Sequence, residues 1–96
     1  MSFLKKLFGG KNQPMSWRDF TLHYTKQCRQ QLDIQPEIEW GDDLENTTVH
    51  LVLPNGTQAA SYLGNFYRQY QQQPDNLDNI IQQAMASLRD MGRDND

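Results

Sequence analysis

The sequence lacks the features that mark disulfide-stabilised, exported and membrane-spanning proteins. Its 96 residues contain a single cysteine, Cys28, so the chain cannot form an internal disulfide or a cysteine-based zinc site. No apolar run approaches the roughly 20 residues of a membrane-spanning helix. The first residues do not form a long apolar segment followed by a small-residue cleavage site. We therefore expect a cytoplasmic protein, with attachment to a membrane surface as the alternative.

Basic residues are missing from the middle of the chain. Residues 30–67 contain six Asp and Glu side chains and no Lys or Arg, a net charge of −6. Residues 1–29 contain six Lys and Arg side chains against one Asp, a net charge of +5. The whole chain carries a net charge of −3, whereas a general nucleic-acid binder is usually basic overall. We expect no nucleic-acid partner. The separation of basic from acidic residues indicates either that the protein is oriented by an electric field or that the two regions attract each other within the fold.

A change of hydrophobic period within residues 47–70 defines the fold class. Val49, Leu51 and Leu53 alternate with residues that face the other way, which predicts a strand with one buried face. Residues 54–56, Pro-Asn-Gly, predict a type I turn closed by a glycine bulge and followed by a short returning strand. The apolar residues then take the spacing of a helix, at Tyr62, Leu63, Phe66, Tyr67 and Tyr70. This switch from strand to helix predicts an α+β protein.

Capping signals and apolar stripes place the remaining elements. Ser16, with Asp19 three residues later, predicts the start of an N-terminal helix. The apolar stripe of this helix is Trp17, Phe20, Tyr24, Cys28 and Leu32. Residues 34–40 alternate as a strand, and Pro36 suits an edge strand. Asp75 predicts the cap of a last helix, whose stripe is Leu77, Ile80, Ile81, Ala84, Met85 and Leu88.

These patterns predict a single α+β domain at residues 14–92. The expected order is an N-terminal helix, a three-stranded antiparallel β-meander, and two C-terminal helices packed on one sheet face. Residues 1–13 are predicted to form a flexible or amphipathic N-terminal tail, and residues 93–96 a disordered tail.

One segment resembles a known family. The run N-F-Y-R-Q-Y-Q-Q-Q-P, which contains Asn65, Tyr67, Tyr70 and Pro74, is similar to a segment of the YtpQ-like bacterial family of unknown function. The resemblance covers Leu51 to Leu88 as a strand, an N-x-Y-x-x-Y helix and a closing amphipathic helix. The resemblance implies a bacterial, cytosolic protein. It implies no catalytic activity or binding residue, because none is assigned to the family.

The leading functional hypothesis is a non-catalytic adaptor or chaperone-like module that binds an unidentified protein partner. One candidate surface is the open sheet face, which would carry Glu37, Glu39 and His50. His50 is expected to approach Glu37 or Glu39 across the sheet. We interpret this contact as a surface pair of a histidine and a carboxylate and not as a catalytic pair.

Aromatic side chains form the other candidate surface. Since each tyrosine hydroxyl needs a partner or water, we expect Tyr67 and Tyr70 to reach the surface. Tyr62 is also predicted to bind a partner, whereas we predict that Trp17, Phe66 and Trp40 belong to the core.

The alternative function is peripheral membrane association. Residues 3–8 combine bulky apolar side chains with lysines, as amphipathic membrane-binding segments do. The predicted membrane or partner contacts are Phe3, Leu4, Lys5, Lys6, Leu7 and Phe8. A frayed tail, or a tail folded back on the domain, is the competing interpretation.

The sequence does not predict an enzyme. The sequence has its densest group of carboxylates at Glu37, Glu39, Asp42, Asp43 and Glu45. Their spacing is not that of a calcium loop. We therefore interpret them as a solvated acidic surface. His23 and Cys28 lie about 140° apart round a helix axis, so they would not form a nucleophile and base pair. A small hydrolase is the third hypothesis, and no catalytic residue, cofactor or metal ligand is predicted.

Overall fold

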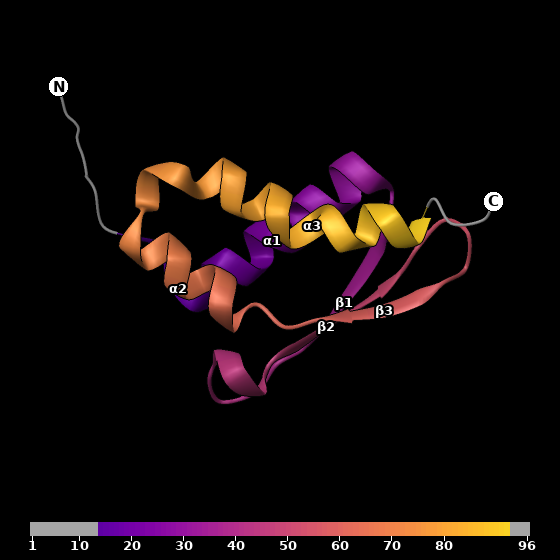
Figure 1. Cartoon of the computed structure of the whole chain (residues 1–96). Coiled ribbons are helices and arrows are strands. Elements are labelled where there is room, and N and C mark those ends of the chain that lie inside the picture. Colours follow the sequence, from indigo (N-terminus) through magenta and orange to yellow (C-terminus); the bar gives the residue numbers. More distant parts are fainter. Residues whose placement is uncertain (1–13, 93–96) are drawn as a thin grey trace, which may run out of the picture.

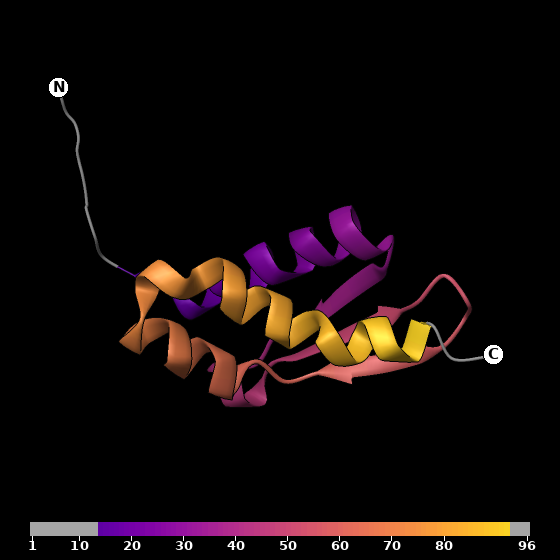
Figure 2. The same ribbon diagram turned by 45° about the horizontal axis from the view of Figure 1, so that its top comes forward.

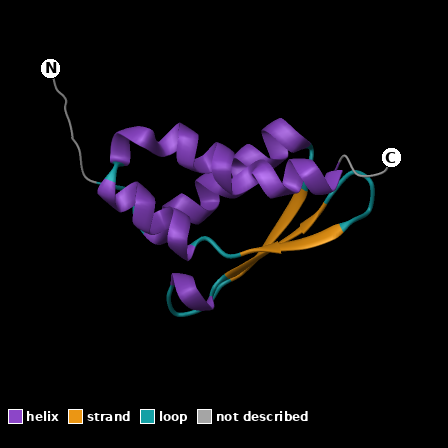
Figure 3. Ribbon diagram, in the orientation of Figure 1, coloured by secondary structure: helices purple, strands orange, loops and turns teal. Residues whose placement is uncertain are grey.

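The structure is a computed structural model in which residues 14–92 are described. The predicted N-terminal segment with Phe3 to Phe8, and the predicted tails 1–13 and 93–96, lie outside the described residues. The helices are α1 (Trp17–Leu32), α2 (Gly64–Gln72) and α3 (Leu77–Gly92), and the strands are β1 (Gln35–Glu39), β2 (Thr48–Val52) and β3 (Gln58–Ser61). Two 3-10 turns, η1 (Leu44–Asn46) and η2 (Pro74–Asn76), lie between them. The order of elements confirms the predicted α+β fold (Figures 1 and 3).

The three strands form one antiparallel sheet in the order β1-β2-β3, so β1 and β3 are its two edges. Pro36 lies in an edge strand, as predicted. In the β2–β3 hairpin the Gly56 amide donates to the Leu53 carbonyl at 2.9 Å, and the Leu53 amide donates to the Thr57 carbonyl at 2.8 Å. Gly56 has a φ of 89°, a conformation that glycine adopts without steric penalty. These contacts confirm the predicted type I turn with a glycine bulge.

Local sequence determines both ends of α1. The Ser16 hydroxyl accepts a hydrogen bond from the Asp19 amide at 3.1 Å, which confirms the predicted N-cap. At the other end Asp33 takes the left-handed conformation, with a φ of 54°, and its amide donates to the Cys28 carbonyl. Asp is among the few residues other than glycine that tolerate this conformation. It turns the chain out of α1 and into β1.

One hydrophobic cluster joins the helices to one face of β2. The predicted buried residues Val49, Leu51 and Leu53 are all at most 3 % exposed. Their neighbours in the cluster include the stripes of α1 and α3, and the buried members are Phe20, Tyr24, Cys28, Ile34, Leu44, Leu63, Tyr70, Ile80, Ile81, Ala84, Met85 and Leu88. A hydrogen bond of 2.9 Å between the Tyr24 hydroxyl and the Ser61 hydroxyl also links α1 to β3.

The helices α1 and α3 run side by side (Figure 2). Polar side chains join their exposed surfaces near one end. The Gln31 side-chain oxygen accepts hydrogen bonds from Gln82 at 3.0 Å and from Arg89 at 3.1 Å. Arg89 also donates to the Gln82 side-chain oxygen at 2.6 Å. These contacts hold the middle and the C-terminal part of α3 against the end of α1.

Three boundaries differ from the sequence predictions. Tyr62 precedes α2 and is 67 % exposed, because β3 ends at Ser61 and α2 begins only at Gly64. Trp40 follows the last residue of β1 and is 41 % exposed, so it is not core. Asp75 does not cap α3. It lies inside η2, because Pro74, with its fixed φ, starts a turn that runs directly into α3.

Candidate protein-interaction surface

The side chains that point away from the hydrophobic cluster define the open sheet face. We use this name for Gln35, Glu37, Glu39, Thr48, His50, Val52, Gln58 and Ala60, all of which are exposed except the half-buried Thr48. The strand register places Glu37, His50 and Ala60 in one row across the sheet. It places Gln35, Val52 and Gln58 in the next row. The face therefore has one large apolar side chain, Val52, and the small Ala60, among carboxylate, imidazole and amide groups.

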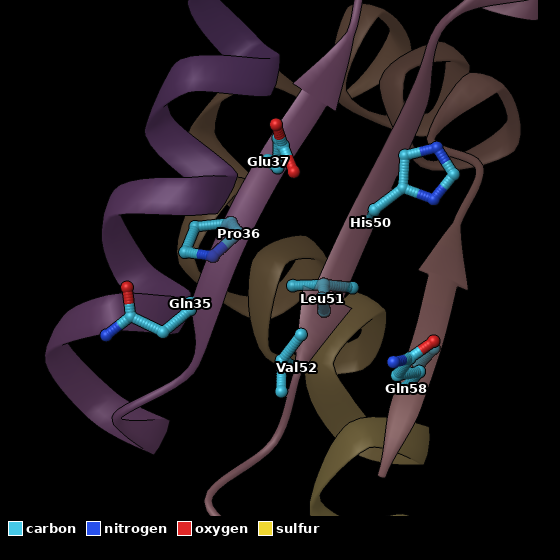
Figure 4. A pocket seen from close by; sticks show the side chains of 8 residues that line it. Gln35, Pro36, Glu37, His50, Leu51, Val52 and Gln58 are labelled. Atoms are coloured by element: carbon cyan, nitrogen blue, oxygen red, sulfur yellow. The ribbon is translucent and has the colours of Figure 1, made fainter. Parts of the chain in front are cut away.

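An open depression of about 470 Å³ lies across these strands. Figure 4 shows it with Glu37 from β1, His50 from β2 and Gln58 from β3 among its lining side chains. Val52 is 44 % exposed here. An apolar contact with a polar rim is the arrangement found in protein interfaces.

The two glutamates of this face differ in their contacts. His50 Nε2 lies 2.9 Å from the Glu39 carboxylate. Either Glu37 or Glu39 was predicted to contact His50, and in the structure it is Glu39 that does. The side chains of His50 and Glu39 are 51 % and 74 % exposed, so the pair contributes no more than about 1 kcal/mol. Glu37 lies directly opposite His50 in the register. Its carboxylate forms no hydrogen bond or ion pair with any other residue in 14–92, and its side chain is exposed.

Two of the three predicted tyrosines bind the backbone of the domain itself. The Tyr67 hydroxyl donates to the Met15 carbonyl at 2.9 Å, and the Tyr70 hydroxyl accepts from the Met15 amide at 2.8 Å. Tyr70 is 5 % exposed, so the expectation that it reaches the surface is wrong. Burial raises the pKa of the Tyr67 hydroxyl, and the neighbouring Tyr70 adds to this effect. Of the predicted tyrosines, Tyr62 is the one that the structure leaves mostly exposed.

A tryptophan and arginine cluster was not predicted from the sequence. The Trp17 and Trp40 rings lie with their centroids 5.9 Å apart at an interplanar angle of 57°. The Arg18 guanidinium lies 4.8 Å from the Trp17 ring centroid and 5.5 Å from that of Trp40. A cation over an exposed ring contributes roughly 0.5–1 kcal/mol. The cluster joins the start of α1 to the end of β1, so Trp17 and Trp40 help to brace the sheet against the first helix.

Burial or internal contacts involve three of the groups considered for catalysis, Cys28, Asp43 and Glu45. Cys28 is buried, and this burial raises the pKa of its thiol to about 11, so the thiol stays protonated near neutral pH. Asp43 accepts a hydrogen bond from the Asn46 amide at 3.1 Å and caps η1. Glu45 pairs with Arg68 at 2.6 Å. Within residues 14–92, no three His, Cys, Asp or Glu side chains are grouped so that they could hold a metal ion.

No protein-family model, curated protein or solved structure matches this chain. The resemblance to the YtpQ-like family therefore stays a prediction. Its residues have structural roles here: Asn65 accepts a hydrogen bond from Arg68 at 2.7 Å, the two tyrosines bind Met15, and Pro74 begins η2. None of the helices in the described part of the chain is long and apolar enough to cross a membrane.

Proposed function

We propose that this protein is a non-catalytic, adaptor or chaperone-like interaction module, and that it binds a protein partner through the open sheet face. The observation that carries the proposal is the exposed Glu37 carboxylate, which has no partner among the described residues and lies in the row beside Val52. An apolar side chain beside charged and polar groups, at a depression, is an arrangement that a protein partner can contact.

Charge indicates what the partner contributes. The open sheet face carries Glu37 and Glu39 and contains no Lys or Arg. A partner segment with a Lys or Arg side chain would pair with Glu37, while an apolar neighbour on the partner covers Val52. The lone cysteine and the resemblance to a bacterial family support a cytoplasmic setting for this interaction.

The test is affinity capture from a bacterial lysate with the full-length chain and two matched variants. Glu37→Lys reverses a charge on the open sheet face. Asp78→Lys makes the same charge change at an exposed position of α3 that contributes nothing to that face. A partner that the wild type and Asp78→Lys retain, and that Glu37→Lys loses, supports the proposal. Equal retention by all three proteins, or no retained protein, contradicts it.

The membrane hypothesis predicts a different outcome of the same experiment. A chain that lacks residues 1–10 retains the protein partner if the open sheet face is the binding surface. Loss of the chain from the membrane fraction after this deletion, with no effect of Glu37→Lys on any captured protein, would replace our proposal with peripheral membrane association.

A further inference from the structure

The two edges of the sheet differ in their protection against pairing with another strand. β1 carries Pro36, Glu37 and Glu39, and both proline and charge discourage edge-to-edge pairing. β3 has the sequence Gln-Ala-Ala-Ser, without proline or charge. An uncharged edge strand of this kind is an open template for a further strand.

The hairpin hydrogen bonds fix which backbone groups of β3 point outward. Because the Leu53 amide donates to the Thr57 carbonyl, residues 53 and 57 form a hydrogen-bonded pair. Such pairs alternate along an antiparallel ladder, so Ala59 and Ser61 direct their backbone groups toward β2. The N–H and C=O groups of Gln58 and Ala60 therefore point away from the sheet. No hydrogen bond within residues 14–92 uses these outward groups.

The same alternation gives β1 a poorer outer edge. Its hydrogen-bonded pairs with β2 include Glu37 with His50, so Pro36 and Ile38 direct their backbone groups outward. Proline has no N–H, and the β1 edge lacks a donor at that position. Of the two edges, only β3 offers an uninterrupted series of donors and acceptors.

We propose that a second copy of this chain pairs with β3, antiparallel and about a two-fold axis at Ala60, to form a homodimer with one continuous sheet. With Ala60 opposite the partner's Ala60, Gln58 lies opposite Tyr62 of the partner subunit. Within β3, the outward backbone groups of Ala60 then face those of the same residue in the other copy, and Gln58 faces the residue that follows the strand. This pairing uses the same edge on both copies, as the interface of a two-fold symmetric dimer does.

The side chains at this edge agree with the pairing. Gln58, Ala60 and Tyr62 carry no charge, so two copies meet without like-charge repulsion. Tyr62 is 67 % exposed in the single chain. In the dimer its ring lies over the partner's Gln58, which removes apolar surface from water. The inference does not depend on the proposed function, because Glu37 lies on the opposite edge strand.

The test is the molar mass of the full-length chain in solution, measured by analytical ultracentrifugation over a range of concentrations. We expect a species of twice the 11.2 kDa chain mass to accumulate as concentration rises. Ala60→Pro removes an outward N–H that the sheet itself does not use. It should weaken dimerisation by about tenfold or more, because the two-fold axis doubles the loss of one hydrogen bond per copy. Circular dichroism checks that this variant folds.

Charge variants keep the test independent of proline effects. Ala60→Lys and Ala60→Glu each place like charges opposite one another in the dimer, so each alone should be monomeric. An equimolar mixture of the two should recover the dimer. Val52→Lys introduces the same charge on the same face but in the central strand, and it should leave the dimer intact.

Three results would overturn the inference. The first is a wild-type chain that stays monomeric at every concentration. The second is a dimer that persists in both Ala60→Pro and Ala60→Lys. The third is a dimer that is lost on deletion of residues 1–13 but not in the Ala60 variants, because this would place the contact in the N-terminal segment.

Discussion

On one face of β2, Val49 and Leu51 are each 1 % exposed and belong to the hydrophobic cluster. On the other face, His50 is exposed and Val52 is 44 % exposed, although these residues alternate with the buried ones along the same strand. Val49 and Val52 have identical side chains in opposite environments. The contrast separates the two faces: residues of the buried face hold the fold together, whereas residues of the open sheet face are exposed to solvent.

The largest expected effect is on the buried face. Leu51→Ala should lower the free energy of unfolding by about 2–5 kcal/mol, because it leaves a cavity in the hydrophobic cluster. Val52→Ala, one residue further along, should change it by no more than about 0.5 kcal/mol. Urea unfolding of both variants at one protein concentration measures the difference. Similar losses of unfolding free energy in the two variants would contradict the distinction between the buried face and the open sheet face.

A smaller effect is expected where a tyrosine has an internal partner. Tyr70→Phe removes the hydroxyl that accepts a hydrogen bond from the Met15 amide. The variant should lower the free energy of unfolding by about 1–2 kcal/mol. Tyr62→Phe removes a hydroxyl that is exposed and should have almost no effect on folding. Hydrogen exchange at the Met15 amide should accelerate in Tyr70→Phe alone. Unchanged exchange there would show that this hydrogen bond does not hold the start of α1.

The buried cluster also gives folding stability a dependence on pH. Burial raises the pKa of Cys28 from 9.0 to about 11, so the folded state keeps the thiol proton at pH values where the unfolded chain loses it. The free energy of unfolding should therefore fall as pH rises from about 9 to about 11. Cys28→Ala should reduce this slope, and the buried Tyr24, whose pKa is also raised, accounts for what remains above pH 10. An unchanged slope in Cys28→Ala would contradict the assignment.

The smallest expected effect concerns the pair on the open sheet face. Glu39→Gln should lower the free energy of unfolding by less than about 1 kcal/mol, because both side chains of the His50–Glu39 pair are more than half exposed. The matched variant Glu37→Gln removes a charge that has no partner among residues 14–92 and should have still less effect. Thermal unfolding of the two variants measures the difference, and a large loss in either would give the open sheet face a structural role.

Features that repeat along the sequence could be predicted, because local geometry alone produces them. The alternation at Val49, Leu51 and Leu53 gave the buried strand face, and the Pro-Asn-Gly turn gave the hairpin. The stripe of α3 gave its buried side, and Pro36 gave the edge position of β1. Each of these follows from the period of an element or from the allowed φ of one residue.

Features that depend on a contact between distant segments could not be predicted. A period of apolar residues does not reveal that the hydroxyls of Tyr67 and Tyr70 meet Met15, which lies more than fifty residues away in the chain. The same holds for Trp40, which the end of β1 brings to Trp17 and Arg18. Strand alternation therefore predicted Glu37, Glu39 and His50 on the open sheet face, whereas the exposure of each tyrosine was determined by tertiary packing.

The most direct test of the division between the two faces of β2 is a single variant, Val52→Lys, with two measurements. We predict that its free energy of unfolding stays within about 0.5 kcal/mol of the wild type, because the long side chain extends into water. We also predict that it loses the protein partner that the wild type captures. A marked loss of stability would contradict the account by making Val52 part of the structural core, and full retention of the partner would contradict it by placing the binding surface elsewhere.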